Sequence, residues 1–239
     1  MKILVLQHAR VEHPGSLRDF LREDGHSWHP VELDEGEALP GLDGYDALWV
    51  LGGPMDVWQE SEFGWLRSEK ELIREAVEVR GMPFLGLCLG HQLLAEALGG
   101  KCGKAEQSEV GVMDVSLTGE GEHSLFFDGV AETFKCLQWH GAEVTEMPPG
   151  AVALATSEAC AVQAMSWGPR AFSAQFHVEV EADTVSNWAA IPDYADALRA
   201  AFGENGVQQL SEACAGAMPE FNRIAERVYL NWLHAAVRS

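Results

Sequence analysis

The chain has 239 residues, a length that suits one large domain with a full hydrophobic core. Its 37 acidic and 16 basic residues give a formal net charge of −21, which argues against nucleic acid and against an anionic membrane surface as partners. No apolar run reaches the length of a membrane span and the first apolar run is too short for a secretory signal, so we expect a cytoplasmic protein whose five cysteines are reduced thiols.

Strand-like and helical patterns alternate through the first hundred residues. The apolar runs that predict strands are residues 2–8, 45–54 and 82–88, and the helical patterns are residues 14–26, 63–81 and 89–100. This alternation is typical of βαβ units, so it predicts an α/β protein with an open, mostly parallel sheet flanked by helices.

The pattern changes after residue 100. Short strand-like runs separated by turns lie at residues 110–126, 132–144, 151–157, 161–167 and 171–180, and helices follow. No linker, repeat or shift in composition divides the chain. We therefore expect residues 1–239 to form a single domain, with a main part of about residues 1–183 and a helical extension of about residues 184–239. We interpret the amphipathic stripe of this extension as core packing or an oligomer contact.

Cys88 lies between two glycines where a predicted strand turns into a predicted helix, in the pattern Gly86-x-Cys88-x-Gly90. A nucleophile on such a sharp turn needs small neighbours two residues away. The start of the following helix favours a thiolate, and the N–H of Leu89 can face an oxyanion. A small buried core cysteine is the alternative that this motif alone leaves open.

His177 and Glu179 are two residues apart in a strand-like run, so they are expected on the same face of that strand. Glu179 can then orient the imidazole while the other ring nitrogen faces a thiolate. The chain order of nucleophile, histidine and acid differs from that of the α/β-hydrolases.

The turn at Gly52 and Gly53 directly follows a predicted strand, so its backbone can approach a ligand closely. Gly53 is therefore a candidate second oxyanion donor and Gly52 a candidate ligand contact. The cysteines and histidines show no zinc-ligand spacing and the chain has no phosphate-binding loop, so we expect no metal and no cofactor.

Together these segments resemble the class I glutamine amidotransferases of the Cys-His-Glu type. The matching segments are GLCLGHQ, LGGPMDV, QFHVEV, LQWHGAEV and SEVGVMDVSLT, and the resemblance extends from about Lys2 to Glu181. It is strongest to stand-alone proteins similar to the amidotransferase domain of GMP synthetase. It implies a flavodoxin-like sheet and the family's site roles.

The resemblance implies that Cys88 attacks the side-chain amide of glutamine, that His177 transfers the proton and that Glu179 orients His177. It implies oxyanion donors at Gly53 and Leu89, and substrate contacts at Gln92, Trp139 and His140 in addition to Gly52. Two positions depart from the family pattern: Val178 stands where proline is frequent, and Trp139 where serine or another residue occurs.

The implied reaction is glutamine hydrolysis to glutamate and ammonia through a thioester, with ammonia passed to an acceptor or to a separate synthetase subunit. A γ-glutamyl peptide hydrolase with the same three residues is the first alternative. A non-catalytic binding or regulatory module is the second, and the intact Cys88, His177 and Glu179 argue against it.

Overall fold

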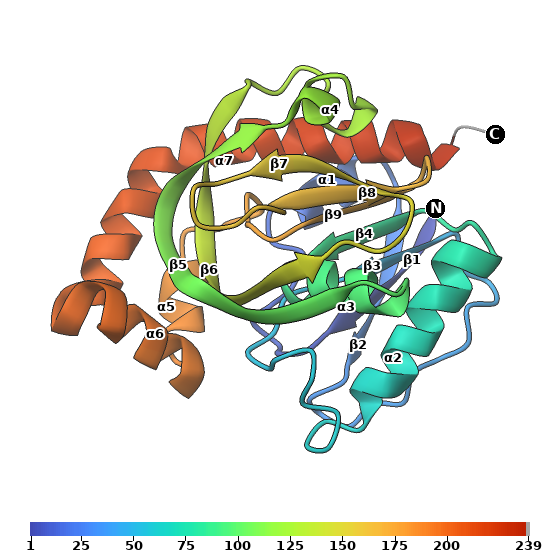
Figure 1. Ribbon diagram of the computed structural model, residues 1–239, viewed down its shortest axis with the longest axis horizontal. Coiled ribbons are helices and arrows are strands. Elements are labelled where there is room, and N and C mark those ends of the chain that lie inside the picture. The colour runs from blue at the N-terminus through green and yellow to red at the C-terminus, as the bar shows by residue number, and fades with distance from the viewer. Residues whose placement is uncertain (238–239) are drawn as a thin grey trace.

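The structure, a computed structural model, describes residues 1–237, and within them nine strands form one sheet flanked by helices (Figure 1). The predicted α/β class, with helices following the last strand, is confirmed. The strands are β1 (Lys2–Gln7), β2 (Ser27–Glu32), β3 (Ala47–Val50), β4 (Phe84–Leu87), β5 (Lys101–Leu117), β6 (Thr133–Glu146), β7 (Ala151–Thr156), β8 (Ala164–Trp167) and β9 (Ala171–Ala174).

The sheet is parallel in one half and antiparallel in the other. Its strand order is β2-β1-β3-β4-β9-β8-β7-β5-β6. The pairs from β2 to β9 are parallel, whereas β8, β7, β5 and β6 pair antiparallel. The carboxyl ends of the parallel strands meet at one edge, which is where open α/β sheets bind ligands.

Helices cover both faces of the sheet. They are α1 (Leu17–Glu23), α2 (Trp65–Arg74), α3 (Leu89–Ala97), α4 (Gly119–Glu122), α5 (Thr184–Trp188), α6 (Pro192–Phe202) and α7 (Gly206–Val237), with short turns η1 (Glu75–Val79), η2 (Leu125–Phe127) and η3 (Gly203–Asn205). Helices α1 and α7 lie on one face of the sheet, and α2 and α3 lie on the other (Figure 1). Their apolar side chains pack there against the strands in two separate clusters. Alternate residues of the central strands point into the two cores.

A third apolar cluster joins the extension to the antiparallel half of the sheet. Trp188 of α5 and Tyr194 of α6 pack against Trp139 of β6, with ring centroids 5.8 and 5.7 Å from that indole. Pro219 lies inside α7, and this helix bends along its length (Figure 1). Among the described residues, no helix combines the length and the apolar character needed to cross a bilayer.

Three strands differ from the sequence-based expectation. β5 begins at Lys101, well before the predicted run of residues 110–126, and it ends at Leu117 because the rest of that run forms α4 and η2. β2 was not predicted, because half of its residues are exposed and they include Pro30, which a strand tolerates at a sheet edge. β9 ends at Ala174, well before the end of the apolar run at Val180. Residues 175–180 are buried without belonging to a strand, except for one antiparallel bridge between His177 and Leu137.

Candidate active site

Cys88 lies at the carboxyl end of β4 and directly precedes α3. Its backbone φ is 51°, and it is the one non-glycine residue with a positive φ in the described chain. A Cβ on Gly90 would lie 2.0 Å from the carbonyl oxygen of Val50, and a Cβ on Gly86 would lie 2.6 Å from that of Gly90. Both glycines are therefore required for the close approach of strand, turn and helix, as the motif predicts.

The His177 imidazole is buried and fixed by Glu179. His177 Nδ1 donates to Glu179 Oε1 at 2.6 Å, and the His177 backbone exchanges two 2.9 Å hydrogen bonds with Leu137. Burial lowers the pKa of His177, but the Glu179 carboxylate and the nearby Cys88 sulfur outweigh this effect, so the pKa is raised well above its usual value. The structure thus brings His177 close to both Glu179 and Cys88, as the sequence predicts.

Val178 has a role that proline could not have. Its N–H donates to Glu179 Oε2 at 3.0 Å, while Oε1 accepts from His177. Proline has no N–H to donate. The departure from the family pattern therefore adds a hydrogen bond that holds the Glu179 carboxylate in place.

Two glutamines connect Cys88 with the neighbouring strands. Gln175 Nε2 lies 3.5 Å from the Cys88 sulfur, and Gln92 Nε2 donates to Gln175 Oε1 at 3.1 Å and to the Ala142 carbonyl at 3.2 Å. Gln175 was not among the predicted site residues. The signal was present, because Gln175 is two residues from His177 in the same run.

A pocket of about 150 Å³ opens over Cys88. Of the residues predicted for the site, it is lined by Gly53, Cys88, Leu89, Gln92, Trp139 and His140. Gly52 lies behind this lining, where a Cβ would be 2.2 Å from Glu12 Oε2. His177 and Glu179 do not line this pocket, and both side chains are buried.

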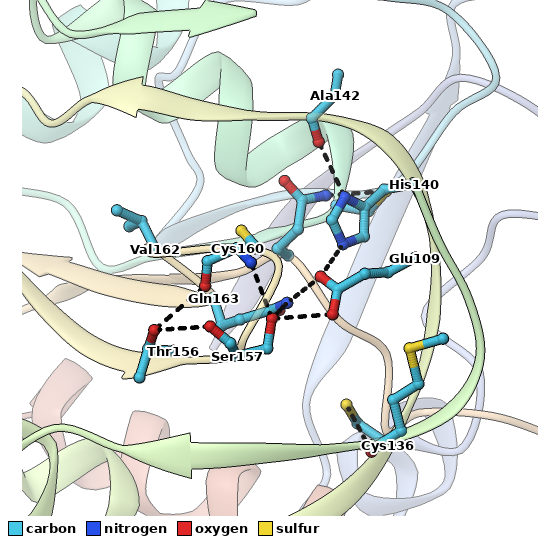
Figure 2. Close-up of polar contacts among 12 residues, drawn as sticks. Glu109, Cys136, His140, Ala142, Thr156, Ser157, Cys160, Val162 and Gln163 are labelled. Carbon is cyan, nitrogen blue, oxygen red and sulfur yellow. Dashed lines mark hydrogen bonds and ion pairs between the residues drawn. The ribbon is translucent and has the colours of Figure 1, made fainter. Parts of the chain in front are cut away.

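The His140 side chain is held by the protein rather than directed to a ligand. Nδ1 donates to the Ala142 carbonyl at 3.0 Å, and Nε2 lies 3.1 Å from Glu109 Oε2 (Figure 2). Glu109 also accepts from Ser157 and Gln163. Burial raises the pKa of Glu109, but the hydrogen bonds from His140 and Ser157 outweigh it and lower this pKa.

Helix α6 contributes one wall of the pocket. Asp193, Tyr194 and Ala197 line it, although sequence analysis assigned this segment to core packing or an oligomer contact. Trp188 of α5 packs edge-on against His177, with ring centroids 4.7 Å apart. No motif in the sequence marked these residues, because their place in the pocket depends on how α5 and α6 fold back over β6.

Glu12 is a buried carboxyl group close to the same site. It follows β1, is 3% exposed, and accepts a short hydrogen bond from the Tyr194 hydroxyl. Burial raises the pKa of Glu12, and the lowering effects of His177 and Tyr194 do not overcome it. Sequence analysis missed this residue as well.

The other four cysteines do not line the pocket. Burial raises the pKa of Cys160 to about 12 and that of Cys214 to about 11, and it raises those of Cys102 and Cys136 too. All five cysteines are free thiols. Within residues 1–237, no three histidine, cysteine or acidic side chains group as metal ligands would.

A family model of glutamine amidotransferase class-I matches residues 16–187, and the chain belongs to this family. The glutamine amidotransferase-like protein YfeJ of Salmonella typhimurium is 29% identical over 189 residues, which are 77% of this chain and 78% of that protein. One subunit of the glutamine-hydrolyzing GMP synthase of Thermococcus kodakarensis is 36% identical over 125 residues, 50% of this chain and 65% of that subunit.

Two further matches concern a peptidase and a solved structure. Gamma-glutamyl peptidase 3 of Arabidopsis thaliana is 29% identical over 164 residues, 66% of this chain and 64% of that protein. The crystal structure of a glutamine amidotransferase from Thermotoga maritima superposes with a TM-score of 0.86 at 28% identity, covering 100% of this chain and 99% of that one.

Proposed function

We propose that the protein hydrolyses the side-chain amide of glutamine to glutamate and ammonia through a thioester on Cys88. The observation that supports this most directly is the strained turn that places the Cys88 sulfur at the start of α3, close to the imidazole of His177, which Glu179 holds at 2.6 Å. A helix N-terminus and a neighbouring imidazolium both favour the thiolate form of cysteine.

In this proposal the Cys88 thiolate attacks the amide carbon, and the carbonyl oxygen becomes an oxyanion held by the N–H groups of Gly53 and Leu89. His177 then donates its proton to the departing nitrogen as the C–N bond breaks, which releases ammonia and leaves the γ-glutamyl thioester. In the second half, neutral His177 takes a proton from water, the resulting hydroxide attacks the thioester, and Cys88 leaves as the thiolate.

The remaining predicted residues shape the substrate side of the pocket. We propose that Gln92 and the backbone of Trp139 and His140 contact the amino-acid end of glutamine, because all three residues line the pocket with Cys88. Since lining residues extend from Gly53 to Ala197, we further propose that the main part and the helical extension act as one domain.

Ammonia must reach an acceptor. The matching GMP synthase relative of Thermococcus kodakarensis is one subunit of its enzyme, and we propose on this basis that a separate synthetase subunit receives the ammonia. We propose that the protein is located in the cytoplasm, where thiols stay reduced, because all five cysteines are free thiols.

The second candidate function is hydrolysis of γ-glutamyl peptides by the same residues, which the match to a gamma-glutamyl peptidase favours. The leaving group would then be an amino acid or peptide instead of ammonia. Both reactions use the same thioester, so only the substrate distinguishes them.

The test is a substrate panel on the purified chain. Glutamine should release ammonia and γ-glutamyl dipeptides should release little amino acid, while Cys88→Ala abolishes turnover and the buried control Cys214→Ala does not. Faster release from the dipeptides would support the second function. A chain that forms no thioester with any γ-glutamyl compound, tested by mass and by trapping with hydroxylamine, would be a binding or regulatory module.

A further inference from the structure

A buried ion pair lies beneath the Gly52–Gly53 turn and has no part in the steps above. His8 directly follows β1, Glu69 belongs to α2, and their side chains are fully buried. His8 Nε2 lies 2.9 Å from Glu69 Oε1 and 3.2 Å from Oε2. Two apolar side chains would join β1 and α2 at lower desolvation cost, so this pair suggests a task besides packing.

The second ring nitrogen of His8 contacts the turn itself. Nδ1 lies 2.9 Å from the carbonyl oxygen of Gly52. A carbonyl oxygen only accepts, so Nδ1 carries a proton whatever the charge on the ring. Burial lowers the pKa of His8, but Glu69 raises it more, with smaller contributions from Gly52 and from Glu12. The ring thus donates through Nδ1 to the turn and contacts the Glu69 carboxyl group through Nε2.

This contact fixes the orientation of one peptide group. The described chain has no cis peptide bond, and in a planar trans peptide the C=O and the following N–H point to opposite sides. Since the Gly52 carbonyl points to His8, the Gly53 N–H points away from it. Gly53 shares the pocket lining with Cys88 and Leu89.

Packing limits the freedom of the turn. A Cβ on Gly53 would lie 2.6 Å from His8 Cβ and 3.0 Å from Leu89 Cδ2, so the backbone passes tightly between these two residues. The indole of Trp65 stacks on the His8 ring at 5.3 Å and blocks its other side. The ring and the peptide thus hold each other in place.

We propose that His8, anchored by Glu69, is a positioning residue that keeps the Gly53 N–H directed toward Cys88, so that the second oxyanion donor is in place before substrate binds. This inference depends on the proposed thioester chemistry. It implies that the isolated chain has its oxyanion hole formed without a partner subunit.

Two isosteric variants separate the two ring nitrogens. The amide nitrogen of asparagine occupies the place of Nδ1, and that of glutamine the place of Nε2. Both variants are made together with Glu69→Gln, which avoids a buried unpaired carboxylate. His8→Asn keeps the donor to the Gly52 carbonyl and His8→Gln loses it. Relative to histidine, the two variants change the side-chain volume and the charge by nearly the same amount.

The readouts are kcat and KM for glutamine and the rate of Cys88 alkylation by iodoacetamide. His8→Gln should lower kcat by about 100- to 1000-fold with KM changed little, as loss of one oxyanion donor does. His8→Asn should keep kcat within about tenfold of the Glu69→Gln parent. Alkylation should be equal in both, because it forms no oxyanion and depends on the thiolate alone.

Equal losses of kcat in the two variants, or alkylation that falls in parallel with kcat, would overturn the inference and leave a merely structural pair. A wild-type chain that is never acylated would refute the proposed function and this inference with it. If the His8→Gln variant does not fold, Glu69→Gln alone provides the test. This change removes the charge that holds His8, so it should lower kcat and leave KM unchanged. An unchanged kcat would contradict the proposal.

Discussion

Cys88 adopts a backbone conformation that side-chain-bearing residues rarely adopt, and its neighbours at positions 86 and 90 carry no side chain at all. The two glycines let Val50, Cys88 and the first turn of α3 lie within van der Waals contact. Strain of this kind is tolerated where the surrounding structure over-determines it. The position of the Cys88 sulfur therefore depends on the absence of side chains at positions 86 and 90 as much as on the contacts that Cys88 makes.

Gly90→Ala should strongly destabilise the protein, because its Cβ would lie 2.0 Å from the Val50 carbonyl oxygen. We expect a loss of at least about 1–3 kcal/mol in the free energy of unfolding, typical of overpacking. Gly216→Ala is the matched control: it lies in α7 with open space around it, and should gain about 0.5–1 kcal/mol. Urea unfolding measures both, and an equal effect of the two changes would contradict this account.

Glu179→Gln should cause activity to fall at a lower pH on the alkaline side of the pH profile. The raised pKa of His177 keeps the imidazolium present above its usual range, and the Glu179 carboxylate is a main cause. Without that charge the pKa falls, so the alkaline limb of kcat/KM moves to lower pH. Glu181→Gln, which removes a partner of Arg18 instead, should leave that limb in place. A limb that is unmoved in Glu179→Gln would refute the assignment.

At the scale of single elements, sequence and structure agree where a pattern is local. The strand before Cys88 and the helix after it follow from apolar periodicity, and Gly99 ends α3 with φ 93° as expected of a helix-ending glycine. The pair His177 and Glu179 was placed on one face by alternation, and their 2.6 Å hydrogen bond agrees, although β9 had already ended.

The parts that sequence did not predict depend on contacts between distant segments. Glu12 and Tyr194 are separated by 182 residues and meet only after α6 folds over the sheet. In the sequence, His8 is the last residue of a predicted strand, and Glu69 is one of several charged residues in a predicted helix. No periodicity or motif spacing encodes such a meeting, so these residues emerge from tertiary packing alone.

Tyr194→Phe should loosen α6 without removing its ring from the pocket. The phenol donates to the buried Glu12 carboxyl, and loss of that donor should cost about 1–3 kcal/mol. Tyr229→Phe, whose hydroxyl donates to Asp24 nearer the surface, should cost less. Urea unfolding gives the costs, and hydrogen exchange in α6 should rise only in the Tyr194 variant. Equal costs would show that the Glu12 contact is unimportant.

At the scale of the whole molecule, buried histidines shape the pH dependence of folding in opposite ways. His8 and His177 have raised pKa values, so their stabilisation is full below pH 6.5 and is lost as pH rises through the folded values. His91, buried between Ser173 and the Val162 carbonyl, has its pKa lowered by burial to about 3. Its neutral ring stabilises the fold fully above pH 6.5.

His91 therefore predicts a slope on the acid side. Between pH 6.5 and about 3 the unfolded chain binds a proton that the folded chain excludes, so the free energy of unfolding falls with falling pH by up to about 1.4 kcal/mol per unit. His91→Gln, which keeps a donor to Val162, should remove this component. Exposed His123→Gln is the control. If the free energies of unfolding of wild type and His91→Gln changed in parallel from pH 4 to 7, this predicted contribution of His91 would be contradicted.

The raised pKa values of the other four thiols have a consequence for how this molecule responds to oxidants. Peroxide reacts with thiolates, and the other sulfurs are held protonated at neutral pH. In the proposed mechanism Cys88 reacts as a thiolate, so peroxide should oxidise the Cys88 sulfur selectively. The oxidised protein should stay folded but lose its activity. A thiol reductant that reverses the first oxidation step would then restore the whole population at once.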